Sequence, residues 1–207
     1  AYCTPGIAPI GDRWQILSVG SRAMQSYDLD TGRELWSVRH TSFNAAIRPL
    51  WLPAEGLALI NTGSRSAQLL AVRVNPSTSG DVTDSHVVWQ RDKGNPRFAK
   101  PIYRDGRIYQ ITDIGVACCL DAASGEELWK DRIPGDYRSS PILAGEHLYF
   151  FSEQGRGTVL KTGSEFREVA VNEVPGMGTT ACPAVAQDAI FVRGRNHLYK
   201  IKEADGR

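Results

Sequence analysis

Apolar and polar residues follow one another along this chain in short runs that turn residues separate. In the clearest stretch, an apolar and aromatic run at 107–111 follows a turn at 105–106. A second run at 116–121 leads to a turn at 124–125, and a third run contains Trp129. Short runs of β-branched and aromatic residues bounded by Gly, Asp and Ser are typical of β-strands joined by tight hairpins. No stretch combines a 3.6-residue period with helix caps, so the pattern predicts a chain made almost entirely of strands.

The same order of strands and turns occurs in five copies. Each copy opens at a proline, and these prolines are Pro5, Pro49, Pro101, Pro141 and Pro183. Successive prolines lie about 40 to 50 residues apart, a period typical of repeat architectures. The longest copy carries an insertion at 75–85, whose Pro, Ser, Thr and Gly residues indicate a surface loop. A four-stranded meander cannot bury both of its faces alone, so the repeat predicts copies stacked around an axis.

We therefore predict an all-β protein, a β-propeller of four-stranded antiparallel blades. About five blades are expected within one partial propeller domain over 1–207, with bounds near 4–40, 41–92, 93–133, 134–175 and 176–201. The last copy stops after its third strand, and the first begins at its innermost strand. Because unpaired strand edges favour association, we expect the chain to be part of a larger ring of seven or eight blades whose N-terminal blades are missing. A closed five-bladed ring, or two chains that associate through the open edge, are the alternatives.

Three copies end in a tryptophan on the expected outermost strand, namely Trp36, Trp89 and Trp129. A large flat ring with one N–H group can pack against a neighbouring blade and donate a hydrogen bond to its backbone. We expect these three side chains to act as clamps between blades. The fourth copy has no tryptophan at this point, so its clamp is either weaker or replaced by Phe166.

Composition excludes several classes of function. Lys and Arg number 24 and Asp and Glu number 23, so no overall field attracts nucleic acid or an anionic membrane. No apolar run approaches the roughly 20 residues that a transmembrane helix needs. The last copy is locally basic through Arg193 and Arg195, which we interpret as a solvated rim.

Two segments, 27–36 and 119–129, resemble the tryptophan-docking repeat of quinoprotein-type (PQQ-like) propellers, which fixes an Asp, a Gly and a Trp at set offsets. The segments 80–89 and 197–201 look like the C-terminal half of bacterial PQQ-binding-like repeat proteins of planctomycete type. The resemblance implies export, so we expect a periplasmic or secreted protein. It also implies two classes of function: dehydrogenases that oxidise alcohols or sugars with PQQ and calcium, and non-catalytic scaffolds such as the outer-membrane assembly lipoprotein, which bind protein partners.

Two groups of residues could carry cofactor chemistry. Alcohol-oxidising quinoproteins have adjacent cysteines in a strained disulfide against the cofactor, and Cys118 and Cys119 resemble that pair. They lie within an expected strand, where successive side chains alternate between faces, so two small buried apolar residues are the preferred interpretation. Asp81, Asp84 and His86 lie together in the insertion and could bind calcium through oxygen ligands. The alternative is that these polar residues hydrogen-bond their own backbone in turns.

The loops 91–98, 134–138 and 174–178 each lead into an innermost strand, so we expect them to meet at one mouth of the propeller. Their aromatic, Arg and Met residues are types that interfaces prefer; they are Arg97, Phe98, Tyr137, Arg138 and Met177. The predicted function is a non-catalytic scaffold or binding module, without a cofactor, for a protein or carbohydrate-like partner at this mouth. A PQQ- and calcium-dependent dehydrogenase, or a sensory propeller fused to an unseen catalytic domain, is the alternative.

Overall fold

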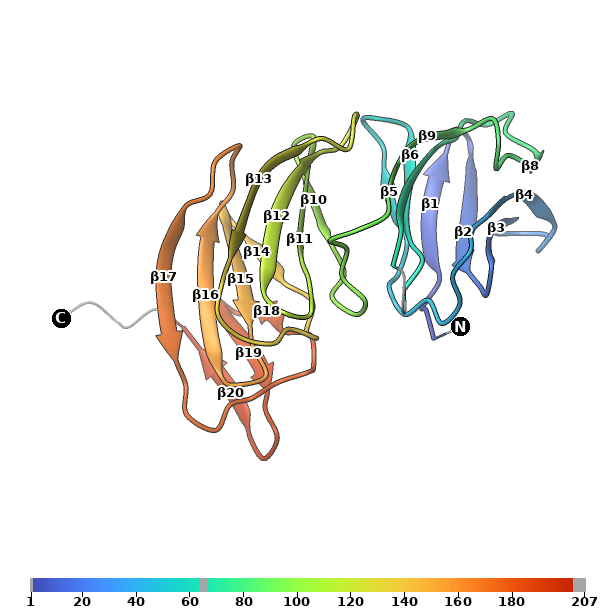
Figure 1. Ribbon diagram of the computed structural model, residues 1–207. Helices are drawn as coiled ribbons and strands as arrows, with labels where there is room; N and C mark the ends of the chain where they lie inside the picture. The colour runs from blue at the N-terminus through green and yellow to red at the C-terminus, as the bar shows by residue number, and fades with distance from the viewer. Residues whose placement is uncertain (1, 64–66, 203–207) are drawn as a thin grey trace. The chain divides into compact units, whose positions relative to one another are not determined.

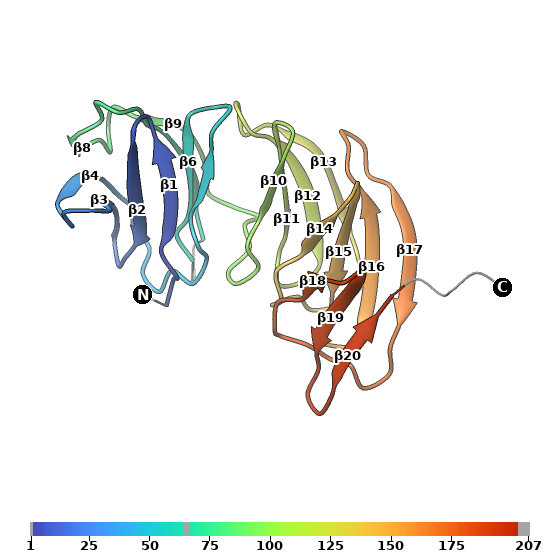
Figure 2. The ribbon, with the colours of Figure 1, turned by 180° about the vertical axis from the view of Figure 1, so that it is seen from behind.

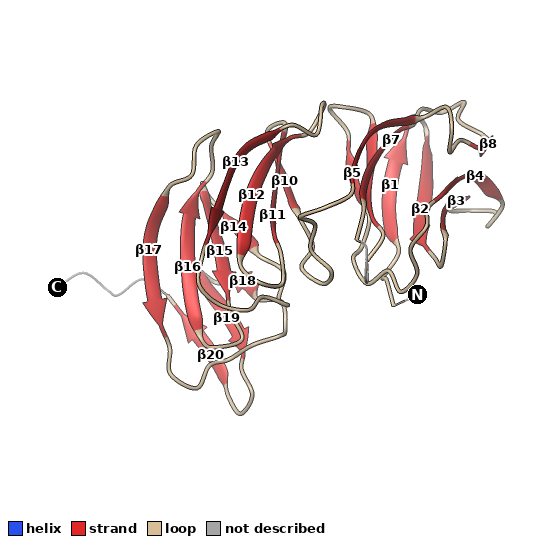
Figure 3. Cartoon of the chain, viewed as in Figure 1, coloured by secondary structure: helices blue, strands red, loops and turns tan. Residues whose placement is uncertain are grey.

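Every secondary-structure element in the computed structural model, which describes residues 2–63 and 67–202, is a β-strand (Figures 1 and 3). The strands form five sheets, three of them four-stranded. The pairings given for these sheets are antiparallel, apart from one short parallel pair described below. The predicted all-β class with four-stranded antiparallel sheets is therefore confirmed. No helix able to span a bilayer occurs in the described part of the chain.

The sheets follow one another along the sequence. The first contains β1 (Gly6–Ile10), β2 (Arg13–Val19), β3 (Ala23–Asp28), β4 (Glu34–Arg39) and β8 (Gly80–Asp81). The second contains β5 (Leu50–Leu52), β6 (Leu57–Asn61), β7 (Leu69–Arg73) and β9 (Val87–Arg91). The third contains β10 (Ile102–Arg104), β11 (Arg107–Ile111), β12 (Val116–Asp121) and β13 (Glu127–Arg132). The fourth contains β14 (Ile142–Ala144), β15 (His147–Phe151), β16 (Arg156–Lys161) and β17 (Glu168–Glu173), and the fifth contains β18 (Ala184–Ala186), β19 (Ala189–Arg193) and β20 (Leu198–Ile201).

The chain divides into two compact units. Unit 1 takes in the residues up to 97 together with 103–107 and 121–126, and unit 2 takes in 98–102, 108–120 and the residues from 127 onward. Unit 1 thus holds the first two sheets and two hairpin tips of the third sheet. Unit 2 holds the rest of the third sheet and the fourth and fifth sheets.

Tight turns with two successive left-handed residues join the first two strands of the third and fifth sheets. Asp105 and Gly106 have φ values of 49° and 72°, and Gln187 and Asp188 have values of 50° and 54°. A two-residue hairpin of type I′ requires positive φ at both central positions, which Gly, Asn and Asp adopt most easily. The Asp105-Gly106 pair therefore predicts this hairpin because both residues readily adopt the positive φ that the turn requires.

The third and fourth strands of four sheets share one irregularity of register. Each pair shifts at a bulge, and the residue of the fourth strand that is paired just before the shift is a tryptophan in three sheets. The four pairs are Ser26 with Trp36, Ala71 with Trp89, Cys119 with Trp129, and Val159 with Ala170. Ala170 therefore occupies in the fourth sheet the position that tryptophan occupies in the other three.

The insertion at 75–85 is more ordered than a surface loop, and that prediction is wrong for its second half. Gly80 and Asp81 form β8, which pairs in parallel with β4 along its outer edge. Val82 follows, donates its backbone N–H to Ser37 at 2.8 Å, and is only 2% exposed. The insertion thus extends the first sheet and covers an edge that unpaired strands would leave open.

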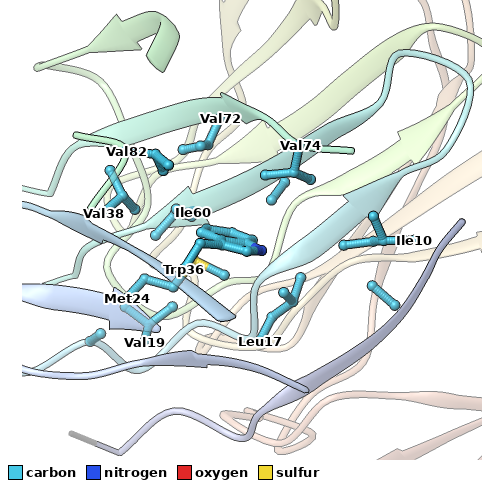
Figure 4. Packing of buried hydrophobic residues seen from close by; sticks show 13 residues of the cluster. Ile10, Leu17, Val19, Met24, Trp36, Val38, Ile60, Val72, Val74 and Val82 are labelled. Carbon is cyan, nitrogen blue, oxygen red and sulfur yellow. The ribbon is translucent and has the colours of Figure 1, made fainter. Parts of the chain in front are cut away.

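Each unit has a core built between its own sheets. In unit 1, Trp36 lies among Met24 and Val38 of its own sheet and Ile60 and Val72 of the second sheet (Figure 4). In unit 2, the larger cluster joins the third and fourth sheets, whereas the cluster beside the fifth sheet has a smaller buried centre of Phe151, Met177 and Val192.

Candidate functional site

Two of the three predicted clamp tryptophans donate their indole N–H to a hairpin carbonyl of the sheet that follows in sequence. Trp129 Nε1 lies 3.1 Å from the carbonyl oxygen of Gly163, whose N–H in turn donates to the hydroxyl of Tyr109 at 2.9 Å. Trp89 Nε1 lies 3.1 Å from the carbonyl oxygen of Ala122, within unit 1. These N–H groups are used inside the protein, so the rings are structural rather than available to a ligand.

The hydrogen bond of Trp36 differs from the one predicted for a clamp between blades. Its Nε1 donates at 3.0 Å to Oε1 of Gln15 in its own sheet, and the hydroxyl of Ser26 donates to the same oxygen at 2.7 Å. The ring still packs between sheets, but its hydrogen bond does not cross to the second sheet. A buried amide acceptor on β2 satisfies the indole locally, which the spacing of the repeat could not reveal.

Of the two alternatives for the fourth sheet, a weaker clamp or a replacement by Phe166, the replacement by Phe166 is wrong. Phe166 packs edge-on against Trp129, with ring centroids 5.4 Å apart, so it supports the junction of the third and fourth sheets. The register position of the clamp on β17 is held by Ala170, which is exposed.

Cys118 and Cys119 are buried thiols on β12, only 1% and 0% exposed. Cys119 lies in the core cluster of unit 2 with Ala117, two residues away, whereas Sγ of Cys118 accepts a hydrogen bond from Gln110. This arrangement fits the alternation of side chains along a strand. Buried thiols directed to different surroundings do not form the strained face against which a quinone would stack, so these residues do not fit PQQ.

The polar residues of the insertion form turn contacts. Asp81 accepts hydrogen bonds from both the backbone N–H and the hydroxyl of Thr83, and it forms an ion pair with Arg39 at 3.1 Å. The hydrogen bonds from Thr83 lower the pKa of Asp81. Asp84 is exposed and His86 is half-buried. Because its carboxylate already faces the Arg39 guanidinium and accepts from Thr83, Asp81 does not fit the role of a calcium ligand. No group of three or more His, Cys, Asp or Glu residues suited to a metal ion occurs in the described ranges.

Hydrogen bonds join the loops at one end of the sheets in unit 2. Tyr137 N donates to Asp113 O at 2.9 Å, and Glu153 N donates to Asp136 O at 2.8 Å. Thr179 continues the series, since its hydroxyl donates to the carbonyl of Arg193 at 2.7 Å. The turns of three sheets and the two loops between them therefore form one continuous surface, which we call the mouth.

Two of the residues predicted to line the mouth are core residues, and for them the prediction is wrong. Tyr137 and Met177 are both 0% exposed. The Tyr137 hydroxyl donates to Pro134 O at 3.0 Å, and burial raises the pKa of this phenol. Met177 packs against Phe151 and Val192. Both side chains anchor their loops from below instead of contacting a partner.

Two other predicted residues meet at the surface of the mouth. The guanidinium carbon of Arg138 lies 5.3 Å from the ring centroid of Phe98, which is 41% exposed. Arg138 Nε also pairs with Glu153 Oε1 at 2.7 Å. Arginine over an aromatic face gains a cation–π attraction, and the carboxylate fixes the direction of the guanidinium. Arg97, the fifth predicted residue, is exposed and belongs to unit 1.

Sequence reasoning missed the polar half of this surface. Glu153 lines a small pocket of about 100 Å³ together with Gly178, Thr179, Thr180, Arg193, Gly194 and Arg195. We define the mouth surface as Phe98, Arg138, Glu153, Thr180, Arg193 and Arg195. The two added arginines were visible in the sequence as a basic segment, but only the turn between β19 and β20 brings them to the mouth.

Comparison with known proteins places this geometry in context. The family described as outer membrane protein assembly factor BamB matches residues 7–165. The crystal structure of BamB from Moraxella catarrhalis superposes with a TM-score of 0.71 at 19% identity, over 98% of this chain and 58% of that one. The WD40 domain of Toxoplasma gondii coronin gives a TM-score of 0.66 at 13% identity, over 95% of this chain and 54% of that one. No curated protein matches the sequence.

These likenesses confirm the predicted propeller fold. The chain spans little more than half the length of both solved structures. The predicted PQQ-like repeat is also confirmed, whereas the planctomycete type stays a prediction.

Proposed function

This chain belongs to the family described as outer membrane protein assembly factor BamB, and from that premise we propose that it is a non-catalytic propeller module that binds a protein partner through the mouth surface. The family description names an assembly factor, and propellers of this kind present turns and loops at a mouth on a rigid frame. A carbohydrate-like partner, which the sequence also suggested, is the less favoured ligand because the mouth has one exposed aromatic ring among charged groups.

The observation that carries the proposal is the exposed stack of Arg138 on Phe98 beside two further arginines. A few residues carry most of the binding energy in protein interfaces, and arginine and the aromatic residues tryptophan and tyrosine are enriched among them. Arg138 pairs with Glu153, so among the residues that line the small pocket Arg193 and Arg195 contribute two further positive charges. A partner segment with an apolar side chain for Phe98 and carboxylates for the two arginines is complementary to it.

The anchoring of the loops supports the same proposal. Tyr137 and Met177 are buried beneath the mouth, so the exposed side chains start from ordered backbone. A preorganised surface loses less conformational entropy on binding than a mobile loop does. We further propose that the protein acts in the periplasm or is secreted, as its family description suggests.

Site-specific photo-crosslinking in cells that make the full protein tests the proposal. A benzophenone amino acid at Phe98 or Arg195 should give a covalent adduct with one protein, whereas the same residue at Val169 on β17 should not. The double variant Arg193→Glu with Arg195→Glu should reduce the adduct formed from position 98. Absence of an adduct from both mouth positions, or an equal adduct from Val169, contradicts the proposal.

The enzymatic alternative has a separate test. Purified protein supplied with PQQ and calcium should not catalyse dye-linked oxidation of alcohols or sugars. Reproducible turnover that requires both additions would replace the binding module with a quinoprotein dehydrogenase.

A further inference from the structure

A pocket of about 290 Å³ lies in unit 1, at the end of the first sheet where β1 turns into β2. The strands supply charged residues and an amide to its lining, and the insertion supplies a proline and three hydroxyl groups. Figure 2 shows β8 of the insertion beside β4, near this end of the sheet. A Cβ at Gly11 would clash with the ring of Pro76, and Asn75 N donates to the Thr78 hydroxyl at 2.9 Å. The insertion is therefore a closely packed and internally bonded wall of the pocket.

The amide of Gln15 directs two N–H groups into this pocket. Gln15 is only 2% exposed, and it is one of the lining residues. An indole N–H can only donate, so Oε1 of Gln15 must face Trp36, from which it accepts at 3.0 Å; Ser26 donates to the same oxygen at 2.7 Å. Nε2 then points the other way, donates to no group in the described part of the chain, and is not enclosed by protein atoms. A buried amide normally has its donors bonded, so these N–H groups are available to an acceptor in the pocket.

The charged residues that line the pocket are Arg13, Arg33 and Glu34. None of the three side chains forms an ion pair with another residue of the ranges 2–63 and 67–202. Asp28 lies within electrostatic reach of Arg13, but it does not line the pocket, and its carboxylate already accepts from Thr31 N and Oγ1 at 2.9 and 2.7 Å. Two guanidinium groups against one carboxylate leave the lining with an excess of positive charge.

This set of donors and charges favours a carboxylate. The planar N–H forks of two guanidinium groups match the two oxygens of a carboxylate, and the amide of Gln15 adds further donors. A monoanion offsets the excess charge, whereas a dianion such as phosphate is repelled more strongly by Glu34. The volume of about 290 Å³ is near the lower end of the range of roughly 300–1,000 Å³ for ligand pockets, so the ligand is small. Leu35 and Pro76 offer carbon surface to its chain.

We propose that this pocket binds the carboxylate group of a small organic acid through Arg13, Gln15 and Arg33. A carboxylate that accepts from Nε2 of Gln15 polarises the amide, and the indole of Trp36, which donates to Oε1 of the same amide, should respond. No lining residue of this pocket belongs to the mouth surface, so the proposal does not depend on the proposed function.

Two-dimensional ¹H–¹⁵N NMR on the full chain tests the proposal, with propionate as the probe at constant ionic strength. The indole N–H signal of Trp36 should shift saturably, with a Kd in the millimolar range that a ligand of this size allows. Propionamide has the same shape without the charge and should bind about tenfold more weakly or worse, because it forms no charge-assisted hydrogen bond. Inorganic phosphate should also bind more weakly than propionate.

Four variants identify the groups that bind the probe. Arg33→Gln should weaken propionate binding by about tenfold or more. Arg22→Gln is the matched control, because it removes the same charge from an exposed position in the turn between β2 and β3, at the opposite end of the sheet, and should leave affinity within about twofold. Glu34→Gln should tighten binding by about twofold or more, since it removes a repelling carboxylate. Gln15→Glu keeps an acceptor for Trp36 but removes the N–H donors, so it should abolish binding.

The proposal stays testable if Gln15→Glu does not fold, because Arg22, Arg33 and Glu34 are exposed and their variants should give the circular dichroism spectrum of the unmodified protein. The absence of a saturable shift with propionate, equal binding of propionamide, or tighter binding of phosphate each overturns it. So does unchanged affinity in Arg33→Gln, or weaker binding in Glu34→Gln. Variants of the mouth surface should leave propionate binding unchanged.

Discussion

Gly125→Ala should destabilise the protein far more than Gly32→Ala, although the two glycines occupy equivalent turns. Each is the fifth residue of a turn that opens with Asp, and each N–H donates to the Asp carbonyl at 2.9 Å. Their φ values are 75° and 70°, so a side chain imposes about the same strain at both, roughly 1–2 kcal/mol. A Cβ at Gly32 meets nothing within 4 Å, whereas a Cβ at Gly125 would lie 2.6 Å from Cδ2 of Trp89.

The difference in stability between the two alanine variants measures how closely the ring of Trp89 packs against the hairpin that contains Gly125. A contact of that length cannot persist, so the ring must move away from the hairpin or the turn must shift. Overpacking of this kind costs about 1–3 kcal/mol. The total is about 1–2 kcal/mol for Gly32→Ala and about 2–5 kcal/mol for Gly125→Ala. With a urea dependence near 2 kcal/mol per molar, the two midpoints should differ by about 0.5–1.5 M.

Urea unfolding followed by far-UV circular dichroism gives the two midpoints. A double-mutant cycle identifies the cause, because in a Trp89→Ala background the excess cost at Gly125 should fall to that at Gly32. Equal midpoints for the two alanine variants refute the docking argument. So does an excess cost that persists after the indole has been removed.

Three further results are expected. Burial lowers the pKa of His40 below its ordinary value of 6.5, so the unfolded chain binds the proton more readily than the folded protein does. The stability of the fold should therefore be full above pH 6.5 and fall as the pH drops below it. In melting temperatures measured between pH 7.5 and 5.5, His40→Gln should reduce this dependence of stability on pH. Gln15→Leu should cost about 1–3 kcal/mol in urea unfolding, because it removes the buried acceptor of Trp36; a neutral result contradicts this role. Met177→Ala should cost about 2–5 kcal/mol and Phe98→Ala less than about 1 kcal/mol by the same assay, and the reverse order would restore Met177 to the mouth surface.

The parts of the fold that sequence could predict have local causes. Alternation of apolar and polar residues marks a strand because side chains of a strand alternate between faces. Asp105-Gly106 marks a hairpin because its backbone needs positive φ. The five copies, the strand order and the propeller class all followed from such signals, and Trp89 and Trp129 reach hairpin carbonyls as their shape suggested.

The parts that sequence could not predict depend on contacts between segments distant along the chain. Tyr137 and Met177 lie in loops of interface-like composition, yet neighbouring sheets bury them completely. Gly80 and Asp81 read as a turn, but they pair with β4 some forty residues earlier in the chain. Trp36 finds a buried amide in its own sheet. None of these outcomes leaves a trace in local composition, because burial is decided by the partner surface.

The candidate sites arise where the copies differ, and this has a physical reason. Where a copy follows the repeat, its polar groups are already bonded: the indole of Trp129 donates to Gly163, and the carboxylate of Asp121 accepts from Ser124. Such groups cannot serve a ligand without breaking the blade. Arg138 and Arg195 are instead local to single copies, and each adds an exposed cation at the mouth. Ligand choice in this chain should therefore change with substitutions at copy-specific positions, whereas substitutions in the repeat motif should change stability first.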